Sequence, residues 1–166
     1  INLSYKKITN CSKLIRINRE NILQDSINEL KKSHEKVHSI RVEYIHENGV
    51  DMGGLTRDWF TNVSQSIIES NIFKPVPNGT SFEFNMNNFN RNIIEFAGKL
   101  FGLAFVNRIC IPLKLTSSIW KFLFNEKITL DDMNDYDSEI CESLKWISEN
   151  DPEPMMMTFV NSENQP

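Results

Sequence analysis

The chain has 166 residues, of which 40% are hydrophobic and 24% are charged, and its formal net charge is −4. These values are typical of one globular domain that is long enough to bury a core. An acidic chain has no excess of lysine and arginine to neutralise phosphates, and no apolar run reaches the ~18–20 residues that cross a bilayer. We therefore expect neither a nucleic acid nor a membrane as a partner.

Three cysteines, Cys11, Cys110 and Cys141, lie far apart and form no Cys-x-x-Cys pair. This pattern argues against a disulfide framework or a zinc site, and it favours a cytoplasmic or nuclear protein. Cys110 lies between Ile109 and Ile111, in surroundings expected to be apolar, and Cys141 has glutamates nearby. Neither setting favours a reactive thiolate. We expect no cofactor and no metal ion.

The first half of the chain alternates between helix and strand. Apolar residues at helical spacing predict helices, and strict alternation predicts a strand. In chain order these patterns place a helix over 19–32 with Asn18 as its N-cap, a strand over 40–46, a turn over 47–54, a helix over 55–70 and short extended pieces over 73–84. Residues 1–18 show no clear period.

The second half is mainly helical. The longest helix is expected over 90–108, and because it is apolar around much of its circumference it should be a central core helix. Further elements follow in order: short helices over 117–124 and 130–134 with Thr116 and Thr129 as N-caps, a helix over 138–148 and an extended segment over 155–160. The acidic run over 131–139 lacks the glycine and final glutamate of a calcium loop and is expected to be solvated.

One segment, from Ile40 to Phe60, carries most of the information and reads IRVEYIHENGVDMGGLTRDWF. Its order is a strand, a turn and the start of a helix. We expect its residues to have mainly structural roles: glycines for the sharp turn, acidic side chains that accept bonds from backbone N–H groups or from arginine, and aromatic anchors. These residues are Glu47, Gly49, Asp51, Gly53, Gly54, Arg57, Trp59 and Phe60.

This segment closely resembles the corresponding part of the HECT family of ubiquitin ligases. Three further stretches are similar to the family in the same order: RENILQDSINEL from Arg19, FAGKLFGLAFVN from Phe96, and SLKWISEN with MMMTF between Ser143 and Phe159. Asp58 and Lys99 stand where the family usually has glutamate and arginine, and Lys99 lacks the planar fork of arginine.

The resemblance implies an α+β fold, mostly helical with a few short antiparallel strands, that of the N-terminal lobe of a HECT domain. It makes residues 1–166 a partial domain, cut off before the C-terminal lobe. Within it, about 1–137 would form the large subdomain and about 138–166 the start of the small subdomain that binds the conjugating enzyme.

The resemblance also implies that the parent protein is an enzyme. A HECT ligase takes ubiquitin from a conjugating enzyme onto its own cysteine as a thioester and passes it to substrate lysines. The threonine–cysteine motif of the C-terminal lobe has no match here, so no residue of this chain is expected to be catalytic. Substrates would be selected by regions outside this sequence. The alternative is a non-catalytic helical protein-interaction module, and a cysteine-dependent enzyme is disfavoured.

Two binding sites follow from the same resemblance. The apolar groove for the conjugating enzyme would include Ile140, Ser143, Leu144, Ile147, Met155 and Met157. Without the resemblance, this stripe would be interpreted as ordinary core. Some branches bind a second ubiquitin through a tyrosine and a phenylalanine, at the positions of Met52 and Phe159. Because Met52 lacks the ring and hydroxyl, we expect weak ubiquitin binding, or a methionine that only fills a loop pocket.

Overall fold

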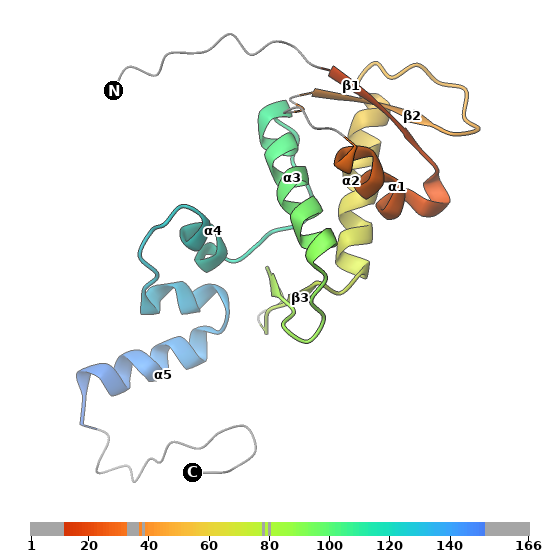
Figure 1. The fold of residues 1–166 in the computed structure, drawn as a ribbon. Coiled ribbons are helices and arrows are strands. Elements are labelled where there is room, and N and C mark those ends of the chain that lie inside the picture. The colour runs from red at the N-terminus through yellow and green to blue at the C-terminus, as the bar shows by residue number, and fades with distance from the viewer. Residues whose placement is uncertain (1–11, 33–36, 38, 78, 80, 152–166) are drawn as a thin grey trace, which may run out of the picture. The chain divides into compact units, whose positions relative to one another are not determined.

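The structure, a computed structural model, describes residues 12–32, 37, 39–77, 79 and 81–151 (Figure 1). Its α+β fold is mostly helical, as expected, and contains in chain order β1 Ser12–Ile17, η1 Arg19–Asn21, α1 Ile22–Lys31, β2 Ser39–Tyr44, α2 Gly54–Glu69, β3 Phe73–Pro75, β4 Phe82–Phe84, α3 Arg91–Asn107, α4 Ser117–Leu123, η2 Leu130–Asp135 and α5 Ser138–Glu149. The chain divides into two compact units: unit 1 contains Ile1–Lys74 and Phe84–Lys114, and unit 2 contains Pro75–Glu83 and Leu115–Pro166.

The sheet of unit 1 consists of β1 and β2, which pair in parallel with Ile15 opposite Val42. The expectation of antiparallel strands is therefore wrong for this pair. The reason is topological, because α1 lies between the two strands and returns the chain to the same end of the sheet. Strand β1 was not predicted at all. Its alternation is obscured by Leu14, which is 50% exposed and directly precedes the buried Ile15.

The core of unit 1 lies between one face of this sheet and the helices α1, α2 and α3 (Figure 1). Trp59 and Phe60 are completely buried, as predicted, and their rings meet edge to face with centroids 4.9 Å apart. The Trp59 indole N–H donates to the hydroxyl of Ser26 in α1 at 2.9 Å. The tryptophan therefore joins α2 to α1 while keeping its one polar atom satisfied.

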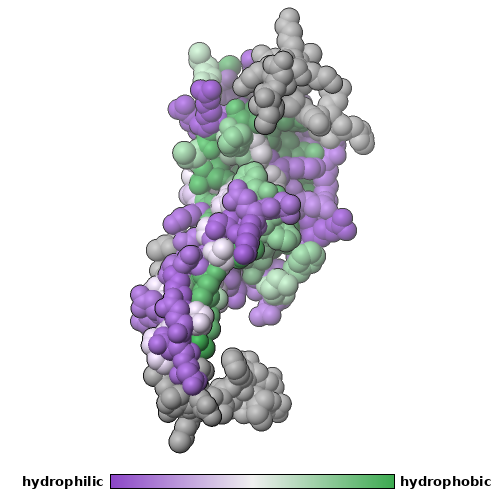
Figure 2. Space-filling model, turned by 90° about the vertical axis from the view of Figure 1, so that its left-hand side faces the viewer, coloured by the Kyte–Doolittle hydropathy of each residue, from purple (hydrophilic) through white to green (hydrophobic). Residues whose placement is uncertain are grey.

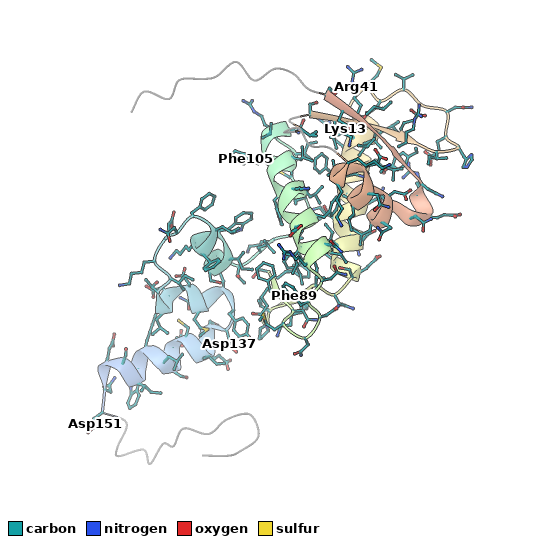
Figure 3. All side chains as sticks on the ribbon, in the orientation of Figure 1. Lys13, Arg41, Phe89, Phe105, Asp137 and Asp151 are labelled. Carbon is teal, nitrogen blue, oxygen red and sulfur yellow. The ribbon has the colours of Figure 1, made fainter. Side chains whose placement is uncertain are left out.

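Helix α3 departs from the expected central core helix. One side is buried through Phe96, Leu100 and Leu103, but Phe105 is 85% exposed and Val106 is 52% exposed. Figure 3 shows Phe105 projecting from the side of α3 that faces away from α2. An apolar circumference is buried all round only where other elements surround the helix, and within the described residues no element covers this side.

The extended pieces expected over 73–84 form the two-stranded sheet β3–β4. Its flanking bonds run from the Asn85 N–H to the Ile72 carbonyl and from the Val76 N–H to the Ser81 carbonyl. This pattern is that of an antiparallel hairpin, so the antiparallel expectation is confirmed here.

Unit 2 is built from α4, η2 and α5, and η2 packs against both helices. Thr116 and Thr129 are the N-cap residues of α4 and η2, as predicted. The unit begins at Leu115 in this part of the chain, whereas the subdomain boundary was expected near residue 137. The assignment of a small subdomain to about 138–166 stays a prediction.

In the part of the chain that the structure describes, no helix combines the length and the apolar character needed to cross a membrane.

Candidate docking site

The turn before α2 is organised by the carboxylate of Asp51. It accepts bonds from the backbone N–H groups of Val42 at 2.9 Å and Gly53 at 2.8 Å, from the N–H of Thr56, and from the Thr56 hydroxyl. Burial raises the pKa of Asp51, but these hydrogen bonds outweigh it, and the pKa lies below its usual value. Asp51 thus takes the place of a neighbouring strand at the open edge of β2.

The glycines of this turn have different roles. Gly53 adopts φ +99° and precedes the first residue of α2, so a side chain here would be strained. Gly49 and Gly54 do not have positive φ, whereas His46 takes φ 69°. The left-handed position that Asn48-Gly49 could have supplied is therefore provided earlier, by His46.

Glu47 is bound by Arg19 and not by Arg57. The Arg19 guanidinium donates to both oxygens of Glu47 and to Asp58 at 2.7 Å, and it stacks 3.7 Å above the ring of Tyr44. Burial raises the pKa of Asp58, but the bond and the positive charge of Arg19, together with smaller contributions from neighbouring polar side chains, outweigh it, and the pKa is lowered. The start of the η1–α1 segment is thereby fixed to β2 and α2. Glu47 and Asp51 are thus bonded within the fold, which supports their expected structural role.

Helix α5 is held at its N-terminus and on one side. The Asp137 carboxylate caps it by accepting from the N–H groups of Glu139 and Ile140, each at 3.0 Å. Cys141 is fully buried and its thiol donates to the Leu130 carbonyl at 3.3 Å. These contacts fix the rotation of α5 against η2 and so decide which residues face outward.

The outward residues form what we call the α5 surface, which comprises Ile140, Ser143, Leu144, Trp146 and Ile147. Ile140 is 47% exposed, Leu144 is 37% exposed and Trp146 is 39% exposed. Ser143 is exposed, and Ile147 is half-buried. In Figure 2, hydrophobic surface adjoins hydrophilic surface along the lower part of the molecule, and in Figure 3 the labels Asp137 and Asp151 bracket α5.

The sequence left open whether the stripe of Ile140, Leu144 and Ile147 is ordinary core. Among the described residues, its partial exposure shows that it is not. Met155 and Met157, the strand side of the expected groove, lie outside the described residues. Trp146 was missed by the sequence analysis because it does not fall on the stripe of Ile140 and Leu144. Its signal was its position three residues after Ser143, which makes the two side chains neighbours on a helix.

The acidic run before α5 was expected to be solvated, but several of its carboxylates are bonded within the structure. Asp132 accepts from Lys121 of α4 and from the backbone N–H of Thr129, which lowers the pKa of its carboxyl to about 2. Asp135 accepts from the N–H of Ser117 at 2.9 Å. Asp131 pairs with Lys145 of α5 at 2.5 Å. These carboxylates join α4, η2 and α5, and so they support the α5 surface.

The other expected site residues lie in unit 1 or outside the described residues. Met52 is 94% exposed in the turn of unit 1 and so does not fill a loop pocket, whereas Phe159 lies outside the described residues. Cys110 is exposed, in contrast to the apolar surroundings expected from its neighbours. Within the described residues, no group of acidic, histidine and cysteine side chains could hold a metal ion.

A comparison with known families covers the chain from the end of the strand–turn–helix segment onward. The model of the HECT domain, described as a ubiquitin-transferase, matches residues 60–165, more than half of the chain. The chain therefore belongs to the HECT-domain family.

Individual relatives support this assignment. The chain is 29% identical to the E3 ubiquitin-protein ligase UPL2 of Arabidopsis thaliana over 87% of its own length and 4% of the relative's. It is 29% identical to Nedd-4 of Drosophila melanogaster over 90% of its own length and 16% of the relative's. It is 29% identical to pub3 of Schizosaccharomyces pombe over 82% and 19%, respectively. The chain thus spans less than a fifth of each of these ligases.

Proposed function

We propose that this chain is the docking lobe of a ubiquitin-protein ligase, and that a ubiquitin-conjugating enzyme binds to its α5 surface. The whole protein would transfer ubiquitin in two steps. A cysteine thiolate outside this sequence attacks the thioester carbonyl of ubiquitin and releases the thiolate of the conjugating enzyme. The neutral amine of a substrate lysine then attacks the carbonyl of the new thioester, so that an isopeptide bond forms, the cysteine thiolate leaves and the amine loses a proton. This chain would supply positioning for both steps.

The observation that carries the proposal is the exposed apolar row on a firmly anchored helix. Ile140 and Leu144, four residues apart and 47% and 37% exposed, lie on one side of α5, which is fixed by the Asp137 cap and the buried Cys141. A partner that covers these side chains removes apolar surface from water without having to order the helix first. Membership of the HECT-domain family supports the choice of a conjugating enzyme as that partner.

The test uses the complete HECT domain of the parent protein and measures ubiquitin thioester formation with a charged conjugating enzyme. The variant Leu144→Asp places a charge at the centre of the α5 surface. We expect transfer to fall by about a hundredfold, because an unpaired charge would have to be desolvated on docking. The thermal unfolding temperature should stay within about 2 °C, because Leu144 is already partly exposed.

A matched control is Leu14→Asp, which makes the same substitution at the 50%-exposed leucine of β1 in unit 1. This control should transfer ubiquitin at the normal rate. If Leu144→Asp stays folded and also transfers ubiquitin normally, the assignment of the α5 surface is wrong.

We also propose a cytoplasmic or nuclear location and weak binding of a second ubiquitin near Met52. The location is supported by the two described cysteines, which are free thiols. The exposure of Met52 leaves it available for contact, but methionine lacks the ring of the tyrosine that the resemblance leads us to expect. A titration of the labelled chain with free ubiquitin measures this affinity, and tight binding that survives Met52→Ala would contradict the proposal.

A further inference from the structure

A hollow of about 410 Å³ lies in unit 1 at the start of β2, beside the turn that leads into α2. Its charged lining consists of Arg41 on β2, Arg57 on α2 and Asp51 in the turn. Its apolar lining includes Met52 and Ile109. Arg41 lies opposite Leu14 of the paired strand, on the exposed face of the sheet, and both arginines are exposed.

The two arginines of the hollow differ from others in the chain. Arg16 pairs with Glu43 at 3.2 Å, Arg19 pairs with Glu47 and Asp58, and Arg91 pairs with Glu95 at 2.7 Å. The guanidinium groups of Arg41 and Arg57 form no ion pair or hydrogen bond with any residue that the structure describes.

Neighbouring carboxylates are already engaged. Asp51 accepts four bonds from the backbone and from Thr56, so its oxygens are directed into the turn. Glu43, two residues after Arg41 on the same face of β2, is bound by Arg16. The N-terminus of α2, which begins at Gly54 beside the hollow, adds partial positive charge. In a chain of net charge −4, this hollow is therefore a local site of positive potential.

We propose that the hollow binds an acidic peptide segment of a partner protein, in which a carboxylate side chain is followed by an apolar one. The guanidinium groups of Arg41 and Arg57 would each donate paired bonds to carboxylates, the geometry that arginine provides. The apolar residue of the peptide would cover Met52, which is 94% exposed, and Ile109. An inorganic anion would satisfy the arginines but would leave this apolar lining uncovered, which is why we favour a peptide.

The test measures fluorescence anisotropy of the fluorescein-labelled peptide Gly-Glu-Leu-Glu-Leu-Gly with the 166-residue chain. We expect saturable binding, and no binding of the matched peptide with glutamine in place of glutamate. Arg41→Gln and Arg57→Gln should each weaken binding about tenfold, the effect of losing one charge-assisted interaction. The control Arg91→Gln removes the same charge from α3 and should leave the affinity unchanged.

Three results would overturn the proposal. Binding that is equally weakened by Arg91→Gln would show only general attraction between charges. Binding that survives both Arg41→Gln and Arg57→Gln, or no saturation at millimolar chain, would remove the site. Displacement by inorganic phosphate, beyond that caused by chloride at equal ionic strength, would show an anion site without peptide preference. If Arg57→Gln unfolds the chain, Arg41→Gln still tests the proposal, because Arg41 lies on the exposed face of the sheet.

Discussion

Two regions of the molecule orient their side chains in opposite ways. One is the turn between β2 and α2, and the other is the α5 surface. In the turn, polar side chains are directed inward, and the carboxylate of Asp51 is satisfied by four donors. On α5 it is the apolar side chains of Leu144 and Trp146 that stay partly in water. The turn thus uses its polar groups to hold the fold, whereas α5 presents an apolar surface that a partner could bury.

The difference separates residues that maintain the fold from residues that can bind. A half-buried carboxylate that accepts four bonds from its own turn has little capacity left for a partner, and its removal leaves backbone donors unpaired. An exposed apolar side chain contributes little to folding, but its burial in a complex releases free energy. We therefore expect substitutions in the turn and in the core beneath it to change stability, and substitutions on α5 to change association.

The largest effect on stability is expected from Trp59, and Trp146 serves as its comparison. Trp59→Ala should reduce the free energy of unfolding by about 3–5 kcal/mol, because it leaves a cavity in the core and removes the bond to Ser26. Trp146→Ala should cost less than about 1 kcal/mol, since this side chain is already 39% exposed. Urea denaturation of the chain, followed by circular dichroism, compares the two variants. Equal losses would contradict the distinction between the regions.

The next effect concerns Asp51. Asp51→Asn should reduce the free energy of unfolding by about 2 kcal/mol at pH 7, because a neutral amide cannot accept all the bonds that the carboxylate accepts. Since the pKa of Asp51 is lower in the folded chain than its usual 3.8, its contribution is complete above that pH. It is lost as the pH falls through the lower, folded-state pKa. Urea denaturation at a series of pH values should show the variant and the parent chain converging in acid.

Asp58→Asn is the control for this measurement. It breaks an ion pair with Arg19 in which both side chains are about 40% exposed, at 41% and 42%. Such surface pairs contribute at most about 1 kcal/mol. A loss as large as that of Asp51→Asn would show that the Arg19 bonds, and not the Asp51 turn, hold this segment together.

The smallest effect is an expected absence of reaction. The 166-residue chain, incubated with a charged conjugating enzyme, should form no ubiquitin adduct that a reductant cleaves. Cys141 is fully buried with its thiol bonded to the Leu130 carbonyl, and the threonine–cysteine motif of the family has no match in this sequence. Non-reducing electrophoresis detects such adducts. A reductant-sensitive band that disappears in Cys110→Ser would show that this fragment is itself catalytic.

Local patterns in the sequence were sufficient for most of the elements. The caps at Asn18, Thr116 and Thr129, the period of β2, and the helices around Trp59 and Leu144 were all predicted from the sequence, because capping and amphipathic spacing act within a few residues. The resemblance of the Ile40–Phe60 segment and of three further stretches to the HECT family also led to the correct family.

Other features depended on contacts between residues far apart in the chain. The parallel pairing of β1 with β2, the binding of Glu47 by Arg19, and the exposure of Phe105 could not be read from neighbouring residues. The same is true of the hollow that brings Arg41 and Arg57 together. A sequence pattern specifies which side chains share a face, but only the tertiary structure decides whether another element covers that face, because burial depends on what packs against it.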